Sequence, residues 1–314
     1  LKSFRGISCE PEQIIVGAGT ESLLAILIPL VGTTSHYAME NPGYPKISQI
    51  FNNWKMHFSY VNLDYQGLKV DELSNKQIDV IHVTPSHQFP MGIVMPLQRR
   101  LELLNWAKQS DKHFIIEDDY DSEFRYVGKP IPALQSLDQF GKVIYMNSFS
   151  KSLAPSLRIS YMVVPKLLLQ RFNDNFSYHN CSVSYFDQLV LTKFMQGGHF
   201  ERHLNQMRKV YKTRLDLFTK LFHELAFSSM FTLQGTEAGL HFLMVAKEAD
   251  EKRLTETAKQ KGILIRGLNE FSFKGINHYP TTLVIGYSGL NEEKIKQALK
   301  KLTIIWGIKL DKKA

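Results

Sequence analysis

Long hydrophobic runs and cysteines are both scarce in this chain. No apolar stretch reaches the ~20 residues that a membrane-spanning helix needs, and the opening residues, LKSFRGISCE, lack the apolar segment of a signal peptide. The two cysteines, Cys9 and Cys181, lack metal-site spacing. We therefore expect no metal centre, no membrane contact and a reduced, cytoplasmic location. The chain opens with Leu rather than Met, which favours a fragment of a longer protein.

Repeats, low-complexity tracts and long charge blocks are absent as well. The 314 residues are 44% hydrophobic and 22% charged, an ordinary globular composition, and their formal net charge is +8. A basic balance suits anionic ligands or proximity to nucleic acid, but many ordinary enzymes share it. Charge alone therefore does not choose the class of function.

Short apolar runs alternate with helical patterns in the first half of the chain. Helices are predicted over TESLLAILIPLV and PLQRRLELLNWAKQSDK, and strands over 14–19, 36–40, 79–85, 113–119, 142–150 and 158–165. Apolar strands that alternate with helices predict a mostly parallel sheet buried on both faces. We therefore expect an α/β large domain over residues 1–165.

The pattern changes after Pro165. Residues 166–225 look helical, with one long helix over 199–225, and we interpret them as a bridge between domains. The remainder predicts a strand over 231–246, a helix, two further strands and a last helix. We expect a small α+β domain over residues 226–314.

A glycine turn, GAGTES (17–22), leads from a predicted strand into a helix. Such a turn presents backbone N–H groups and the positive end of the helix dipole, both of which bind phosphate. Plain connections of this kind are common, so the motif is weak by itself.

In the stretch IIEDDYDSEF (115–124), the end of an apolar strand is crowded by four acids, Glu117, Asp118, Asp119 and Asp121. Like charges this close raise each other's pKa unless a cation is near. The stretch is consistent with a solvated acidic turn, with a divalent-metal site, or with a carboxylate that holds a protonated ring nitrogen.

A third stretch, SFSKSLAPSLRIS (148–160), follows another apolar strand. Lys151 is placed to form an imine with an aldehyde, and Arg158 to bind a phosphate with help from Ser148 and Ser150. A phosphate cradle, an acidic anchor and an amine thus meet at one edge of the sheet. Pyridoxal 5′-phosphate is the cofactor that needs all three.

Longer strings carry a family resemblance. In matching order, NPGYP (41–45), VTPSHQFPMG (83–92), IIEDDYDSEFRY (115–126), SFSKSLAPSLRISY (148–161) and GGHFERHLNQMRKVY (197–211) resemble the aminotransferase-like domain of MocR-type, GntR-family transcription regulators. The resemblance implies the fold of type I pyridoxal-phosphate transferases, with a three-layer large domain and a homodimer. It also implies DNA contact through a winged helix-turn-helix, of which this chain shows no pattern.

The resemblance further implies a role for each site residue. Lys151 would carry pyridoxal phosphate as an imine, and Asp118 rather than Asp119 would pair with the ring nitrogen. Tyr120 would bond the ring hydroxyl, and Tyr44 would flank the ring. The residues around the phosphate would be Gly19, Thr20, Ser148, Ser150 and Arg158. The loop that covers the other face of the ring would contain His87 and Gln88.

The chain departs from the family pattern at a few positions. Lys46 stands where GABA-responsive members have an arginine, and lysine matches a carboxylate less well. Arg266 in the small domain is a second candidate partner for an effector carboxylate, although a surface arginine explains it equally well. Ser160 and Met91 also replace usual family residues. These changes disfavour efficient transamination more than they disfavour pyridoxal-phosphate binding.

We therefore predict the effector-binding and dimerisation domain of a regulator that senses pyridoxal phosphate and controls vitamin B6 synthesis. The alternatives are an active aminotransferase, a regulator that responds to an amino acid such as GABA, and a module whose basic helix faces touch DNA. HFERH (199–203) has its glutamate misplaced for a zinc site, which favours a helix surface or packing role.

Overall fold

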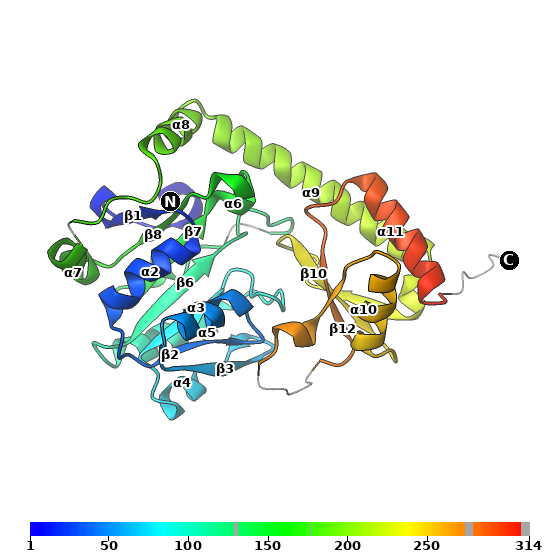
Figure 1. The fold of residues 1–314 in the computed structure, drawn as a ribbon, viewed down its shortest axis with the longest axis horizontal. Coiled ribbons are helices and arrows are strands. Elements are labelled where there is room, and N and C mark those ends of the chain that lie inside the picture. Colours follow the sequence, from blue (N-terminus) through cyan, green and yellow to red (C-terminus); the bar gives the residue numbers. More distant parts are fainter. Residues whose placement is uncertain (129–130, 177, 274–278, 309–314) are drawn as a thin grey trace. The chain divides into compact units, whose positions relative to one another are not determined.

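The chain was analysed as a computed structural model that describes residues 1–128, 131–176, 178–273 and 279–308 (Figure 1). It divides into two compact units. The first unit contains Leu1–Phe89, Ile93–Glu123 and Gly128–Leu204, and the second contains Pro90–Gly92, Phe124–Val127 and the chain from Asn205 onward.

The first unit is built on an eight-stranded sheet with the order β1-β8-β7-β6-β5-β2-β3-β4. Its strands are β1 (Ile14–Gly17), β2 (Tyr37–Asn41), β3 (Phe58–Asp64), β4 (Gly67–Leu68), β5 (Val80–Val83), β6 (Phe114–Asp119), β7 (Val143–Ser148) and β8 (Ser160–Val163). The neighbours among β3, β2, β5, β6 and β7 pair in parallel, whereas β8 runs antiparallel to β7 and β1, and β4 runs antiparallel to β3. The mostly parallel sheet is confirmed.

Helices lie before, between and after these strands. They are α1 (Lys2–Arg5), α2 (Thr20–Val31), α3 (Pro45–Asn53), α4 (Asp71–Asn75), α5 (Leu97–Lys108), α6 (Phe149–Ser152), α7 (Lys166–Phe176), α8 (Tyr185–Gln196) and the start of α9 (His199–Glu224). Short 3-10 turns occupy Pro11–Gln13, Gln135–Leu137 and Pro155–Leu157.

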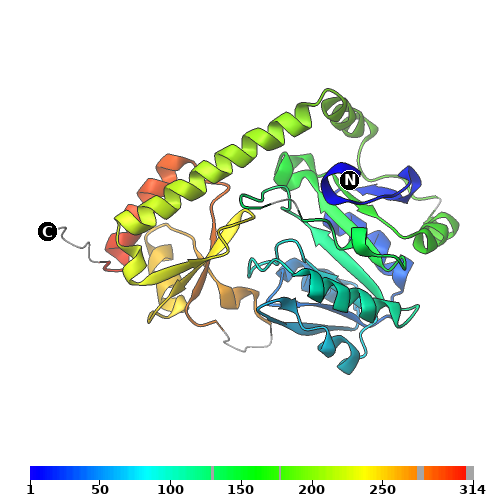
Figure 2. The ribbon, with the colours of Figure 1, turned by 180° about the vertical axis from the view of Figure 1, so that it is seen from behind.

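Both faces of the large sheet are covered by helices. Side chains alternate along a strand, so neighbours on β2 face opposite ways. The Tyr37 ring lies 5.2 Å from the Phe51 ring of α3, while Ala38 belongs to the apolar cluster that contains Leu103 and Trp106 of α5. Accordingly, α2 lies in front of the sheet in Figure 1 and α5 in front of it in Figure 2. The predicted three-layer α/β class is confirmed.

The second unit pairs a four-stranded sheet with helices. The order is β11-β12-β10-β9, all antiparallel, with β9 (Phe231–Gln234), β10 (His241–Ala246), β11 (Arg266–Gly267) and β12 (Thr282–Gly286). The helices of this unit are the remainder of α9, α10 (Glu251–Gln260) and α11 (Glu292–Ile305). Two 3-10 turns, Phe227–Ser229 and Leu268–Phe271, complete it. Phe218, Phe242, Leu254 and Leu299 belong to one core cluster, which joins α9, β10, α10 and α11.

One strand prediction was wrong in this unit. The stretch 231–246 forms two strands, β9 and β10, because Gly235 and Gly239 adopt φ values of 75° and 76° that end an extended run. The proposed division at residues 165 and 225 stays a prediction; α7, α8 and α9 lie between Lys166 and Glu224.

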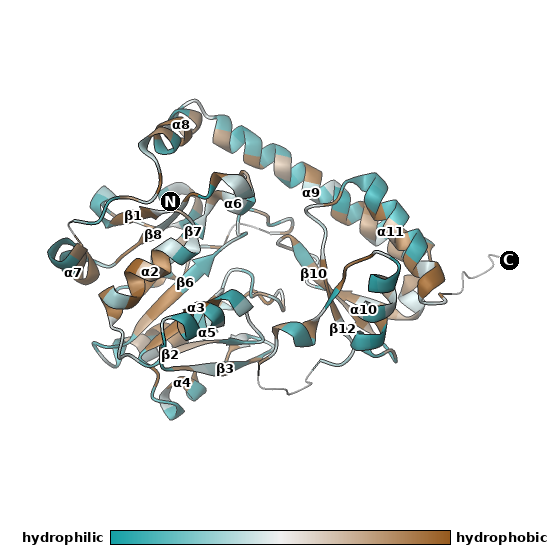
Figure 3. Cartoon of the chain, in the orientation of Figure 1, coloured by the Kyte–Doolittle hydropathy of each residue, from teal (hydrophilic) through white to brown (hydrophobic). Residues whose placement is uncertain are grey.

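Hydropathy follows the burial of each helix. In Figure 3, α2 is largely hydrophobic, whereas α10 is largely hydrophilic. Six residues of α2 are buried, and only Glu251, Leu254 and Ala258 are buried in α10. Within the described ranges, no helix combines the length and apolarity that crossing a membrane requires.

Candidate functional site

The carboxyl ends of β6 and β7 place Asp118 and Lys151 at the same edge of the first unit's sheet. These strands are parallel neighbours, with Asp118 opposite Met146, and β7 ends at Ser148, three residues before Lys151. Lys151 lies on the short helix α6 and is exposed. Ligand sites of open α/β sheets lie at this edge.

Ser148 caps α6 and organises the turn that carries Lys151. Its Oγ accepts a hydrogen bond from the backbone N–H of Ser150 at 3.2 Å, and its hydroxyl donates to Oγ of Ser150 at 3.0 Å. A serine at the helix N-cap satisfies a backbone donor that the helix leaves free. The two serines therefore support each other directly beside Lys151.

Strand alternation separates the neighbouring carboxylates Asp118 and Asp119. Asp119 is buried, with Oδ2 2.8 Å from Nε of Arg5 and accepting a 2.6 Å hydrogen bond from the Tyr145 hydroxyl. Asp118 is only partly buried on the opposite face, and its Oδ2 lies 3.3 Å from Nε2 of His82. Asp119 is thus committed to the interior, while Asp118 remains partly exposed.

A close approach of backbone to arginine defines the predicted phosphate site. Gly19 precedes α2 with a φ of 91°, and a Cβ on it would collide with the guanidinium of Arg158. Nη2 of Arg158 donates to the carbonyl of Ala18 at 3.3 Å. Glycine is needed here both for the backbone angle and for the space, so Arg158 sits directly over the N-terminus of α2, which begins at Thr20.

Glu21, in the first turn of α2, bridges two of the predicted site cations. Its Oε2 lies 2.9 Å from Nη2 of Arg158, and its Oε1 forms an ion pair with Nζ of Lys46. Partial burial acts to raise the pKa of Glu21, but hydrogen bonds from Lys46, its own backbone N–H and Arg158 lower it to about 2. Lys46 therefore has an internal carboxylate partner.

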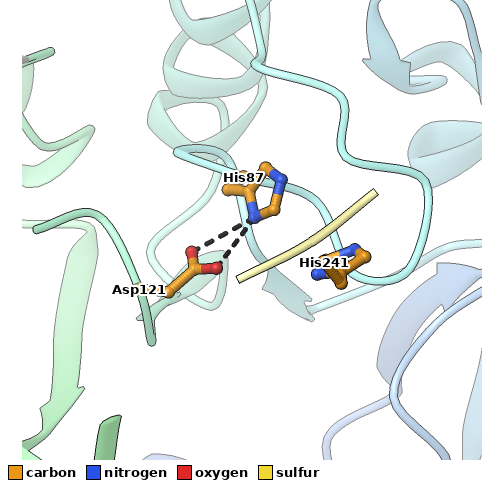
Figure 4. Close-up of side chains that lie close together, drawn as sticks. All are labelled: His87, Asp121 and His241. Carbon is orange, nitrogen blue, oxygen red and sulfur yellow. Dashed lines mark hydrogen bonds and ion pairs between the residues drawn. The ribbon is translucent and has the colours of Figure 1, made fainter. Parts of the chain in front are cut away.

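Figure 4 shows the pair formed by His87 and Asp121, both buried. Nδ1 of His87 lies 3.0 Å from Oδ2 of Asp121, a contact that favours a proton on Nδ1. The Tyr120 hydroxyl oxygen lies 3.1 Å from the same nitrogen. Burial, and then the negative charge of Asp121, raise the pKa of Tyr120 well above its usual value. Tyr120 therefore stays a neutral phenol.

Aromatic rings continue this cluster toward Tyr44. The Tyr44 ring meets Phe89 edge to face at 5.6 Å, and Phe89 meets Tyr120 in the same manner at 6.2 Å. Tyr44 is 44% exposed, so its ring remains accessible.

A buried carboxyl, Glu40, supports the loop that carries Gln88. Its Oε2 accepts hydrogen bonds from the Thr84 backbone N–H at 3.1 Å, the Thr84 hydroxyl at 2.7 Å and Nε2 of Gln88 at 3.2 Å. Nε2 of Gln88 also donates to the carbonyl of Pro42 at 3.0 Å. Burial raises the pKa of Glu40 to about 7, although these hydrogen bonds act to lower it.

Arg266 belongs to the second unit, where it begins β11. It is exposed, and its guanidinium lies 5.9 Å from the centre of the Phe271 ring. Its proposed role as a carboxylate partner stays a prediction.

Sequence reasoning missed Glu21, His82 and Glu40. Each stands next to or within a predicted element: Glu21 in the glycine turn, His82 inside the apolar strand β5, and Glu40 in the apolar strand β2. A polar residue within an apolar strand was an available signal for His82 and Glu40. Glu21 carried no such signal, because acids are common in the first turn of a helix.

The sequence profile of aminotransferase class I and II matches residues 1–302. The chain belongs to this family. It is 41% identical over 311 residues to the uncharacterized HTH-type transcriptional regulator YdeL of Bacillus subtilis, covering 98% of this chain and 66% of the relative. Identity is 32% to the probable rhizopine catabolism regulatory protein MocR of Rhizobium meliloti, over 96% of this chain and 61% of the relative.

A third relative is the HTH-type pyridoxine biosynthesis transcriptional regulator PdxR of Corynebacterium glutamicum. It is 28% identical, over 96% of this chain and 65% of its own length. The chain thus spans slightly less than two thirds of the curated regulators it matches. The predicted resemblance to the aminotransferase-like domain of such regulators is confirmed.

Solved structures agree on the fold. The chain superposes on Pyrococcus horikoshii kynurenine aminotransferase, solved in complex with PMP, with a TM-score of 0.82 and 28% identity, over 98% of this chain and 78% of that one. The predicted transferase fold type I is therefore confirmed.

The raised pKa of Glu40 predicts a specific pH dependence of stability. An unfolded glutamate has a pKa of ~4.3, whereas the folded protein raises the pKa of Glu40 to about 7. Between these two pH values the unfolded state loses the proton and the folded state keeps it, so the stability that the proton contributes at low pH is lost as the pH rises to about 7. We expect the free energy of unfolding of the wild type, relative to Glu40→Gln, to fall between about pH 5 and 7, by at most ~1.4 kcal/mol per pH unit.

Urea unfolding at pH 5, 6 and 7 measures this difference. Glu72→Gln is the matched control, because Lys76 and Asn62 lower the pKa of Glu72 despite its partial burial, so it stays ionised throughout the window. Parallel curves for the wild type and Glu40→Gln would contradict the assignment.

Proposed function

We propose that this chain is the effector-binding and dimerisation domain of a MocR-type transcription regulator that binds pyridoxal 5′-phosphate through Lys151. The observation that carries the proposal is the partly exposed carboxylate of Asp118, 3.3 Å from Nε2 of His82, on the face of β6 opposite to Asp119, which is bound by Arg5. Asp118 and Lys151 follow neighbouring parallel strands to one sheet edge. A ring-nitrogen partner and an amine are therefore available to one ligand.

The phosphate end of the ligand would meet a separate set of groups. Arg158 supplies the guanidinium, the N-terminus of α2 supplies backbone N–H groups, and Gly19 leaves the space that a Cβ would fill. Thr20, Ser148 and Ser150 add hydroxyl groups at the same sheet edge. This set fits a phosphate ester, which accepts several charge-assisted hydrogen bonds.

The ring of the ligand would lie among the remaining predicted residues. Asp118 would accept a hydrogen bond from the protonated ring nitrogen, and His82 would orient its carboxylate. Tyr120, neutral because of its burial, would donate to the ring hydroxyl. Tyr44, His87 and Gln88 would flank the ring. Lys151 would hold the ligand as an imine, formed from its amine and the aldehyde with release of water, and the ring would supply an electron-withdrawing group.

Regulation requires that the ligand prefer one conformation of the whole regulator. A ligand shifts a conformational equilibrium only if it binds the two states with different affinity. We propose that pyridoxal phosphate does so in a cytoplasmic regulator that contacts DNA through a winged helix-turn-helix. The relative PdxR, described as a regulator of pyridoxine biosynthesis, supports genes of pyridoxal-phosphate synthesis as the target. Residues 1–165, 166–225 and 226–314 serve as ligand-binding, bridging and small domains in this proposal.

Substitutions at the sheet edge test the site assignment. Wild-type protein with pyridoxal phosphate should show the yellow absorbance of the lysine-bound ligand. Lys151→Ala should lose it because the attacking amine is gone. Asp118→Asn should weaken binding and alter the spectrum, on the order of tenfold or more in affinity, because the ring nitrogen loses its charged partner.

Two controls accompany these variants. Lys296→Ala removes an exposed lysine of α11, in the second unit, and should leave the spectrum unchanged. Asp119→Asn should lower stability, since it breaks the pair with Arg5, yet keep the spectrum while folded. An unchanged spectrum in Lys151→Ala and Asp118→Asn would remove the assignment.

An apolar surface on α8 supports the dimer. None of the residues of α8 is buried, and Tyr185, Phe186, Leu189 and Val190 are exposed at positions that share one helical face. Monomeric proteins rarely leave a contiguous apolar patch open to water. A second copy of the chain is the proposed cover.

We therefore expect Phe186→Asp to weaken the dimer, because association would bury an unpaired charge. The dissociation constant measured by analytical ultracentrifugation should rise on the order of tenfold or more. Gln170→Asp, on the exposed side of α7, should change nothing. A wild-type monomer, or a Phe186→Asp dimer as tight as the wild type, would rule out this surface.

An active aminotransferase is the second candidate, since the structural neighbours include aminotransferases such as the Pyrococcus horikoshii enzyme. Catalysis would require Lys151 to move a proton during each half-reaction. We expect no sustained turnover when the pyridoxal-phosphate-loaded protein meets amino acids and a keto acid. Product formation at ordinary enzyme rates, ~1–10³ per second, would favour the enzyme instead.

A GABA-type effector is less favoured, because Lys46 already pairs with Glu21.

A further inference from the structure

Glu21 lies against Arg158, the positively charged side chain of the predicted phosphate site. It occupies the first turn of α2, two residues after Gly19, and its carboxylate joins Lys46 on one oxygen and Arg158 on the other. No other carboxylate is paired with Arg158 among the described residues. The group that should receive a phosphate thus already holds an anion.

Arg158 also contacts the backbone that precedes α2. Its guanidinium donates to the Ala18 carbonyl and lies against Gly19, where no Cβ fits. A phosphate bound by Arg158 at this position would lie in contact with Glu21, so the two anions would compete for the same guanidinium.

Electrostatics make this contact unfavourable unless Glu21 moves. The low pKa of Glu21, about 2, keeps it ionised at neutral pH. A phosphate monoester carries about −1.5 to −2 charges at pH 7, and like charges in contact destabilise each other. The side chains of Glu21 and Arg158 are 38% and 50% exposed, so water can replace either partner when the ion pair opens.

We propose that Glu21 sets the affinity of the site by competing with the ligand's phosphate for Arg158. Lys46 stabilises the displaced Glu21, because the ion pair between Lys46 and Glu21 remains when the Glu21 carboxylate leaves Arg158. The competition reduces affinity only for ligands with a phosphate group, so the site fills at a higher concentration of pyridoxal phosphate. This inference rests on the proposed function, since it takes the phosphate of pyridoxal phosphate to bind at Arg158.

The first experiment titrates wild type and Glu21→Gln with pyridoxal phosphate and, separately, with pyridoxal, following the absorbance of the lysine-bound ligand. We expect Glu21→Gln to bind pyridoxal phosphate on the order of tenfold more tightly, a modest gain because the pair is partly exposed and screened. Affinity for pyridoxal, which lacks the phosphate, should stay the same.

Glu72→Gln is the matched charge control. It removes one negative charge from α4, which packs on β3 toward the opposite edge of the sheet, and it should change neither affinity. Glu21→Ala is a second variant in case the glutamine binds Arg158 in its own way, and it should show the same selective gain. Unchanged or weaker binding of pyridoxal phosphate by both Glu21 variants would overturn the inference.

A double-mutant cycle tests the part of Lys46. Lys46→Met should weaken pyridoxal-phosphate binding several-fold in the wild type, because Glu21 would lose its alternative partner, but should have no effect in Glu21→Gln. An equal loss in both backgrounds would mean that Lys46 contacts the phosphate itself, and would overturn this part.

The outcomes separate the two levels of the argument. If the wild type shows no lysine-bound absorbance at all, the proposed function fails, and this inference with it. If the wild type shows that absorbance but the Glu21 variants gain nothing, only the competition by Glu21 fails.

Discussion

The buried pair between Arg5 and Asp119 stabilises the end of the strand from which Asp118 projects. The two charges lie 2.8 Å apart, and the Tyr145 hydroxyl joins the same carboxylate oxygen. Removing either partner would leave an uncompensated charge in the interior, which proteins tolerate poorly. The pair therefore fixes the end of β6, and strand alternation then turns Asp118 to the opposite face. A short segment near the start of the chain, α1, thus holds one of two adjacent acids in the interior and leaves the other unpaired with it.

Much of the fold followed from the sequence, because apolar runs and glycine turns are local signals. The strands at β5, β6 and β7 were visible as runs such as VIHV and FIIEDD, and α2 as an unbroken apolar helix. The break between β9 and β10 was missed, because the sequence does not show which glycines adopt a positive φ; Gly235 and Gly239 both do. The choice of Asp118 over Asp119 came from family resemblance alone; the partners of the two acids, His82 and Arg5, come from distant parts of the chain.

Lys46 illustrates how an internal partner can occupy a predicted ligand-binding side chain. From the sequence it is a candidate for an effector's carboxylate, which stays a prediction, and in the structure it pairs with the carboxylate of Glu21. The same fold supports amino-group transfer in aminotransferases, such as the Pyrococcus horikoshii enzyme. A regulator built on it needs a ligand that leaves again when its concentration falls. Moderate affinity is then a requirement, and internal charge pairs at the phosphate end are one physical means of meeting it.

The exposed helix α8 has a consequence for how the molecule holds its shape. An isolated helix of about 12 residues is only marginally stable in water. Helix α8 has 12 residues, and none of them is buried. Whatever covers this face must therefore contribute to its order. If a second copy covers α8, the stability of this helix depends on the protein concentration. Dilution would then unfold α8 before it affects the sheet.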